Sequence, residues 1–134
     1  MIVVDSNILA YWLLPGEQMA LAERVWQKDP SWIMPSLWKS EFRSILAQYL
    51  RLERLSLPEA LTVMKEAESI LKNKVYDVDS DWVLRLVHKS NCSAYDCEFV
   101  SLAQRFDVIL VTADKKVLQE FPETAVSPQQ FVDG

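Results

Sequence analysis

Short, uniformly apolar runs recur along this chain, and stretches with helical spacing separate them. The runs are Ile2 to Val4, Trp32 to Met34, Val75 to Tyr76, Val108 to Val111 and Thr124 to Val126. A run that is apolar at every position is typical of a strand covered on both faces, as in a parallel sheet. This feature constrains the fold more than any other.

The intervening segments carry apolar residues three or four positions apart, which predicts amphipathic helices. These helices are expected in residues 17 to 28, after Ser36, from Pro58, after Asp79 or Ser80, and after Ser93. The alternation predicts an α/β fold, a three-layer sandwich with a mainly parallel central sheet of four to five strands flanked by helices. A length of 134 residues suits a single domain, residues 1–134.

Charge and hydropathy limit the function. There are 14 Lys and Arg against 19 Asp and Glu, so the net charge is -5. That is the wrong sign for a protein that holds nucleic acid by bulk electrostatics. The longest apolar run, Ile8 to Leu14, has seven residues and is too short to cross a bilayer, and Asp5 interrupts any leader-like segment. We expect a cytoplasmic protein that does not bind membranes.

Cys92 and Cys97 are the two cysteines, too few for a disulfide scaffold. With His88 they form a poor metal cluster that lacks a clear fourth ligand. We expect two reduced thiols.

Two carboxylates directly follow predicted strands. Asp5 ends the first apolar run, and Asp114 comes just beyond Val108 to Val111. The carboxyl ends of parallel strands share one edge of a sheet, where ligands bind and helices begin. We therefore expect Asp5 and Asp114 at the same edge.

Two further carboxylates lie on predicted helices. Asp96 comes three residues before Phe99, on the face that the apolar stripe turns inward, whereas Glu98 is rotated away from Asp96. Glu41 comes four residues before Ile45, at the inward edge of its helix. Both Asp96 and Glu41 are expected to face the interior.

Each acid also has a purely structural explanation. Asp5 and Asp114 suit helix N-caps, and Ser93 to Asp96 fits the S-x-x-D form of a capping box. Capping does not explain why four acids converge on one edge of the sheet. Burying several carboxylates side by side raises their pKa values and is costly unless the charge is compensated.

Lys39, Arg43, Lys115 and Lys116 lie near these acids in sequence, but helical spacing turns at least some of them outward. A hard divalent cation is the simpler compensation. Mg²⁺ or Mn²⁺ takes oxygen ligands and binds through few carboxylates together with water and substrate phosphate. The sequence thus predicts a metal site that includes Asp5.

Four stretches in this order resemble the motifs of the PIN-domain family of metal-dependent ribonucleases, and the resemblance spans nearly the whole chain. The stretches are IVVDSNILA, PSLWKSEFRSIL, SAYDCEFVSLA and ILVTAD. The chain is most similar to the small toxins of type II toxin-antitoxin pairs, the virulence-associated protein C type. Cys97 stands where the family often has alanine, a conservative departure.

The resemblance implies a PIN-like fold and an acidic pocket formed by Asp5, Glu41, Asp96 and Asp114, with supporting hydrogen bonds from Ser6, Asn7 and Thr112. It implies that Asp5, Asp96 and Asp114 hold one or two ions of Mg²⁺ or Mn²⁺. It also implies an RNA substrate, a cognate antitoxin protein and a homodimer. Cleavage would proceed by in-line attack of a metal-activated water, without a side-chain nucleophile.

Two other functions are compatible with parts of the pattern. A phosphatase of the haloacid dehalogenase kind also ends its first strand in Asp, but it needs a second Asp two positions on, where this chain has Asn7. The other alternative is a catalytically silent PIN-like module that binds RNA or a protein, since a fold does not certify a function.

The five tryptophans allow both core and surface roles. Trp26 and Trp82 lie on apolar helical faces, which predicts core packing. Trp12 and Trp38 lie near site carboxylates in sequence and are candidates to line a groove for RNA or a partner.

Overall fold

The computed structural model describes residues 1–134 and has a five-stranded, wholly parallel sheet at its centre. The strand order is β3-β2-β1-β4-β5. The strands are β1 (Ile2–Val4), β2 (Trp32–Pro35), β3 (Val75–Tyr76), β4 (Leu110–Val111) and β5 (Ala125–Val126). The predicted α/β fold with a parallel sheet is confirmed.

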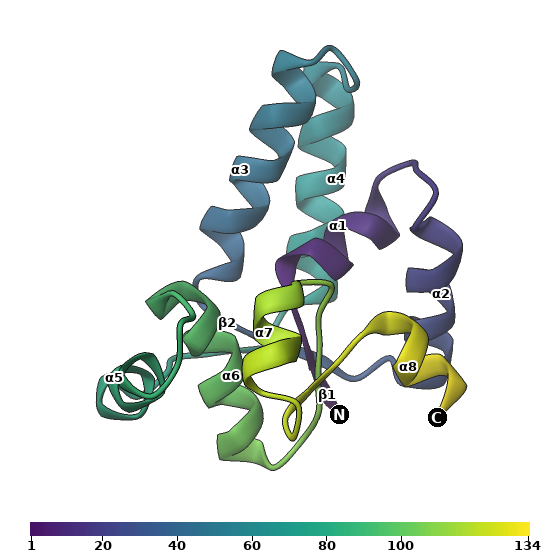
Figure 1. The fold of residues 1–134 in the computed structure, drawn as a ribbon. Helices are drawn as coiled ribbons and strands as arrows, with labels where there is room; N and C mark the ends of the chain where they lie inside the picture. Colours follow the sequence, from purple (N-terminus) through teal and green to yellow (C-terminus); the bar gives the residue numbers. More distant parts are fainter.

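Eight helices surround this sheet (Figure 1). They are α1 (Ser6–Leu13), α2 (Met19–Lys28), α3 (Trp38–Arg51), α4 (Leu57–Ile70), α5 (Ser80–His88), α6 (Ala94–Phe106), α7 (Lys115–Glu120) and α8 (Pro128–Asp133). None of them combines the length and apolarity needed to span a bilayer.

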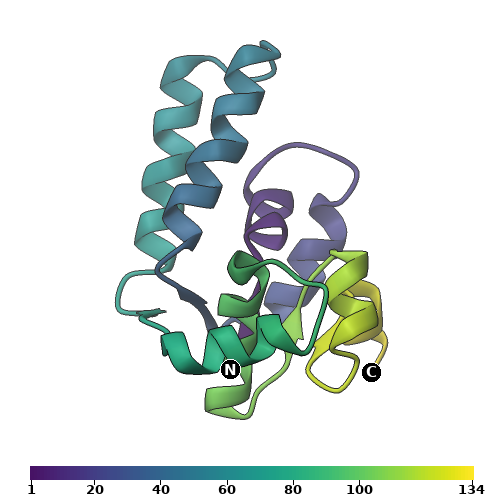
Figure 2. The ribbon, with the colours of Figure 1, turned by 60° about the vertical axis from the view of Figure 1, so that its left-hand side comes forward.

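The direction of the crossovers places the helices in two layers. The chain moves one way along the sheet from β1 to β2 to β3, and the opposite way from β3 to β4 to β5. Because parallel crossovers are right-handed, α1 to α4 cover one face, and α5 and α6 cover the other. Helix α6 packs directly against β1, β2 and β4, and α5 packs against α6. The long helices α3 and α4 project together as a hairpin in both views (Figures 1 and 2).

The inner strands are buried at every position, as the apolar runs predict. Val3, Val4 and Met34 are fully buried, and they belong to a core of 31 buried hydrophobic residues. Burial of apolar surface contributes about 25 cal/mol per Å² to folding, so such a core stabilises the central strands. Its close packing keeps them in register. The sheet is therefore a rigid platform for whatever its carboxyl edge carries.

Apolar spacing predicted none of helices α1, α7 and α8, although the expected N-caps Asp5 and Asp114 do mark where α1 and α7 begin. Helix α1 is buried over most of its surface, so its run Ile8 to Leu14 shows no polar face from which to read a helical period. The other two helices have six residues each, fewer than two turns. For α8 a signal did exist, because Ser127 and Gln130 form a capping box around Pro128.

The tryptophans differ from the prediction at two positions. Trp82 is 36% exposed rather than in the core, and Trp38 is only 2% exposed and packs near Phe42 rather than lining an open groove. Trp12 and Trp26 are half-buried and stack on each other, with their ring centroids 4.3 Å apart, beside the buried Trp32. This cluster is a packing unit of the α1 and α2 layer.

Candidate functional site

Asp5 lies where β1 gives way to α1, and both of its carboxylate oxygens are occupied. It is the N-cap of α1, with Oδ1 accepting a 2.7 Å hydrogen bond from the Ser6 amide. Oδ2 accepts a 2.7 Å hydrogen bond from the hydroxyl of Thr112, which follows β4. Strands β2 and β3 are added on one side of β1, and β4 and β5 on the other, so the strand order reverses between β1 and β4. Open α/β sheets bind ligands at such switch points.

Thr112 connects Asp5 to Asp114. The Thr112 side chain is buried, and its Oγ1 accepts a 3.0 Å hydrogen bond from the Asp114 amide. Asp114 in turn caps α7, because its Oδ1 accepts hydrogen bonds from the amides of Lys116 and Val117. The second oxygen of Asp114, Oδ2, accepts none, so it is available to a ligand.

Ser6 connects Asp5 to Glu41 on the other side. The Ser6 side chain is buried, and its hydroxyl donates a 2.9 Å hydrogen bond to Oε1 of Glu41. Glu41 lies in the first turn of α3, which begins beyond the carboxyl end of β2. A single hydrogen-bonded series thus runs from Glu41 through Ser6, Asp5 and Thr112 to Asp114.

Asp96 joins this series through charge rather than through a hydrogen bond. It occupies the first turn of α6, where its amide donates a 3.1 Å hydrogen bond to the Ser93 hydroxyl. This is one half of the predicted capping box, and interactions with the Ser93 side chain and backbone also lower the pKa of the Asp96 carboxyl. The charges of Asp96 and Asp114 raise the pKa of Asp5, and the charge of Asp114 raises that of Asp96, so these side chains lie close together.

Burial is the main cause of the raised pKa values of the carboxyl groups at this edge of the sheet. It raises the pKa of Asp5, against the hydrogen bonds from Thr112 and Ser6, and the charges of Asp96 and Asp114 add to the rise. Burial also raises the pKa of Glu41 to about 7, with further contributions from nearby acids. The pKa of Asp96 rises by burial and by the charge of Asp114. The metal-free cluster therefore favours bound protons or a cation.

The basic residues near the acids compensate little of this charge. Lys39 instead forms an exposed 3.3 Å ion pair with Glu68, and Arg43 is exposed. Lys116 does lower the pKa of Asp96, as the smallest of the effects on that carboxyl. This agrees with the expectation that helical spacing turns at least some of these side chains outward.

Glu98 is an acid that the sequence analysis set aside. Two residues along a helix from Asp96, it does point away from Asp96, but the structure places α3 within reach of it. Its charge contributes to the raised pKa of Glu41, and burial raises its own pKa. Periodicity within one helix could not have revealed this, because the neighbourhood is created by tertiary packing.

The acids serve both as helix caps and as members of one cluster at the edge of the sheet. Asp5 and Asp114 are helix N-caps, and they are also linked through Thr112. Helix N-termini carry partial positive charge, which partly offsets the desolvation of the two carboxylates. The fold thus uses the same side chains to begin helices and to gather negative charge.

The donor atoms at this edge are oxygens, the type that Mg²⁺ and Mn²⁺ prefer. No three His, Cys, Asp or Glu side chains are grouped closely enough to hold an ion by themselves. A cation at this edge would therefore be held through one or two carboxylates, with water and phosphate completing its shell. Asn7, two residues after Asp5, has a buried Oδ1 that accepts no hydrogen bond from the protein.

Cys92 and Cys97 flank Asp96 in sequence without forming a disulfide. Both are buried, and burial raises the pKa of Cys92 to about 11. His88 is exposed on α5.

Comparisons with known proteins agree with this architecture. A family model described as PIN domain matches residues 2–124. The crystal structure of PAE2754 from Pyrobaculum aerophilum is 21% identical, with a TM-score of 0.77 over 98% of this chain and 93% of that chain. The structure of FitAcB from Neisseria gonorrhoeae is 16% identical, with a TM-score of 0.69 over 96% of this chain and 99% of that one. At these identities the two structures show a shared fold. No curated protein matches the sequence significantly.

Proposed function

Because the chain belongs to the PIN domain family, whose model covers residues 2–124, we propose that it is a Mg²⁺- or Mn²⁺-dependent endoribonuclease. PIN domains are generally nucleases. The RNA substrate and the metal dependence are our inferences from the four acids and the motifs in which they stand.

One observation supports the proposal most strongly. The hydrogen-bonded series that links Glu41, Asp5 and Asp114 spans three separate strand-to-helix transitions. Helix capping alone would not require Ser6 and Thr112 to join these transitions through buried hydroxyls. Groups oriented in this way are what a site needs when it must stabilise charge without reorganising.

The side chains have distinct roles in this proposal. Asp5, Asp96 and Asp114 would hold one or two cations through oxygen atoms. A bound dication lowers the pKa of a coordinated water and polarises the phosphate that the water attacks. Glu41, whose pKa is about 7 in the metal-free protein, can hold or release a proton at a carboxylate oxygen near neutral pH. Ser6 and Thr112 orient the acids, and Asn7 would support them from beside Ser6, with a buried Oδ1 that accepts no hydrogen bond.

The biological setting is a further part of the proposal and depends on the sequence resemblance. We infer a cytoplasmic, single-domain toxin of the virulence-associated protein C type that forms a homodimer and is neutralised by an antitoxin protein. A short reading frame that adjoins or overlaps this one would support it. Harmless expression with no such neighbour would instead favour a housekeeping nuclease.

A catalytically silent PIN-like module that binds RNA or a protein is the second candidate. It is favoured by the lack of any three acids, histidines or cysteines grouped to hold a metal, and by the net charge of -5. The two candidates differ in whether RNA is cut.

The test incubates purified protein with single-stranded and structured RNAs, with Mg²⁺, with Mn²⁺ and with EDTA. We expect cleavage with metal only, and a loss of about 10³-fold or more in Asp5→Asn and Asp96→Asn. Asp107→Asn is the matched control: Asp107 ends the same helix as Asp96 in a left-handed conformation, which asparagine tolerates. Cleavage in EDTA, or full activity in both site variants, would refute the mechanism. No cleavage under any condition would favour the silent module.

A further inference from the structure

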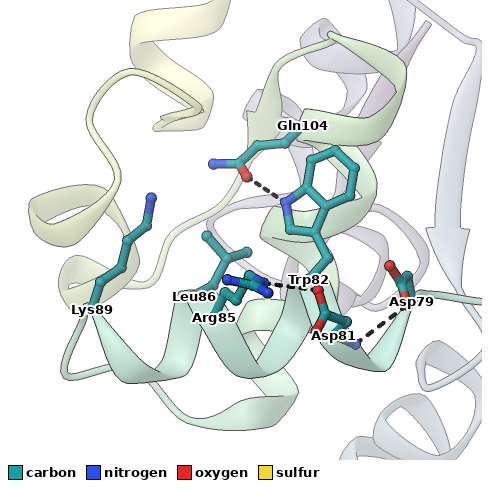
Figure 3. A pocket seen from close by; sticks show the side chains of 7 residues that line it. All are labelled: Asp79, Asp81, Trp82, Arg85, Leu86, Lys89 and Gln104. Atoms are coloured by element: carbon teal, nitrogen blue, oxygen red, sulfur yellow. Dashed lines mark hydrogen bonds and ion pairs between the residues drawn. The ribbon is translucent and has the colours of Figure 1, made fainter.

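A separate cavity of about 330 Å³ lies between α5 and the C-terminal half of α6, away from the four acids (Figure 3). We call it the α5 groove, and its polar and aromatic lining consists of Asp79, Asp81, Trp82, Arg85, Lys89 and Gln104. Gln104 lies eight residues beyond Asp96 on α6, a separation of about 12 Å along the helix axis. The groove is therefore distinct from the acidic edge but within the reach of a short oligonucleotide.

Trp82 is held in one orientation in this groove. Its indole N–H donates a 2.8 Å hydrogen bond to Oε1 of Gln104, and Nε2 of Gln104 donates to the Thr124 hydroxyl at 3.3 Å. The ring is 36% exposed, although its polar edge is satisfied. A fixed indole with an exposed surface and no unmet donor is suited to stack on a planar base.

Two cations follow Trp82 along the same face of α5. Arg85 and Lys89 come three and seven residues later, so the three side chains form one stripe about 10.5 Å long. Nε of Arg85 donates to Asp81 at 2.8 Å, which steadies the guanidinium and leaves both of its terminal nitrogens without an acceptor. Lys89 has no ion pair, and it lines the groove at the C-terminal end of α5 (Figure 3).

Charge is separated along the groove. Asp79 and Asp81 lie at the N-terminal end of α5, and the cations lie toward its C-terminal end. A ligand with one uniform charge does not match this arrangement, whereas a nucleotide does. Its base offers N–H donors and an aromatic face, and its phosphate offers negative charge to donors of the arginine and lysine type.

We propose that the α5 groove binds a nucleotide of single-stranded RNA, with the base stacked on Trp82 and the adjacent phosphate contacted by Arg85 and Lys89. This inference rests on the proposed function, because it takes RNA as the substrate. The cationic end of the groove is the end from which the chain continues through residues 89–93 to α6 and Asp96. The groove anchors the strand by local contacts, which a protein of net charge -5 requires.

The test measures binding rather than cleavage. The dissociation constant of a fluorescently labelled single-stranded RNA of about twelve nucleotides is determined by anisotropy in EDTA, where no cleavage is expected. Trp82→Ala weakens binding about tenfold, and Trp82→Phe, which keeps a ring, weakens it less. Arg85→Ala and Lys89→Ala each lower the slope of log Kd against log salt by about 0.7. Leu84→Ala is the control, since Leu84 is exposed on the same helix outside the groove.

Failure of this inference can be told apart from failure of the proposed nuclease. If Kd changes less than twofold in both Trp82→Ala and Lys89→Ala while circular dichroism shows folded protein, the groove does not bind RNA, whatever the cleavage assay shows. If guanosine monophosphate binds at Trp82 but RNA affinity is unchanged by Trp82→Ala, the RNA proposal is likewise overturned. Weaker RNA binding in the variants supports the groove even where metal-dependent cleavage is absent.

Discussion

The Thr112 hydroxyl donates a 2.7 Å hydrogen bond to Oδ2 of Asp5, which joins two residues 107 positions apart. The register of the sheet makes this bond possible. Val4 pairs with Val111 across β1 and β4, so the residues that follow, Asp5 and Thr112, meet just beyond the end of both strands. The same pairing that buries the core therefore orients the most buried carboxylate of the site.

Replacing Thr112 with valine tests this coupling. Valine preserves the shape but leaves Oδ2 of Asp5 without its donor and the Asp114 amide without its acceptor. Because Thr112 is fully buried, we expect a loss of roughly 1–3 kcal/mol in the free energy of unfolding, measured by urea denaturation. RNA cleavage should fall by about tenfold or more, since Asp5 loses its orientation.

Thr112→Ser is the matched control for that substitution. Serine keeps the hydroxyl and removes one methyl group, so it should retain most of the cleavage activity even if it loses some stability. Equal activity in the valine and serine variants would show that the hydroxyl does not position Asp5.

Glu41 should make the metal-free protein less stable as the pH rises. Its pKa is raised from 4.5 to about 7, so between these values the folded state binds more protons than the unfolded state. The free energy of unfolding then falls as pH increases through this window and levels off above pH 7. After allowance for solvent screening, the part due to Glu41 is on the order of 1–2 kcal/mol.

Glu41→Gln removes this part of the pH dependence. Urea denaturation in EDTA at pH 5 and at pH 8 should show a smaller difference in stability for the variant than for the wild type. The raised pKa values of Asp5 and Asp96 act in the same direction, so some dependence remains. Glu66→Gln on the exposed face of α4 should leave the difference unchanged. A wild type that gains stability toward pH 8 in EDTA would contradict the burial of these acids.

Cys92 and Cys97 should resist alkylation in the folded protein. The exposed fractions of both side chains are 5% or less, and burial raises both pKa values, to about 11 for Cys92. The thiolate that reacts is therefore scarce at pH 8. Mass spectrometry after treatment with iodoacetamide should show little modification in buffer and two adducts in urea. Rapid modification of Cys92 without denaturant would show that the segment before α6 opens readily.

The sequence was most informative where local pattern and tertiary environment coincide. Uniform burial of β1 and β2 makes their runs apolar throughout, so the parallel sheet could be inferred from these runs and the helical segments between them. The same logic located Asp5 and Asp114, because the end of a buried strand is visible in sequence. Ser93 likewise marked the start of α6 through a local capping preference.

The features that were missed depend on contacts between distant segments. Glu98 acts on Glu41 only because the fold brings the first turns of α6 and α3 close enough for the two charges to interact. Trp82 lies on an apolar stripe, but the edge of α5 is left uncovered, and Gln104 satisfies its indole from another helix. Both relationships join residues on different helices, so neither can be recognised from the spacing of residues within one helix.

A divalent cation should stabilise the folded protein measurably, independently of any RNA. Binding to the folded state alone adds RT ln(1 + [M]/Kd) to stability, about 2.7 kcal/mol at a hundredfold excess over Kd. For a domain of this size that raises the melting temperature by several degrees.

The increase should be larger at pH 8 than at pH 5, because protons compete with the cation for Asp5 and Asp96, whose pKa values are raised. Asp5→Asn and Asp96→Asn should abolish the increase, and Asp107→Asn should preserve it. If Mg²⁺ and Mn²⁺ shift the melting temperature equally in all four proteins, the cation does not bind at this edge of the sheet.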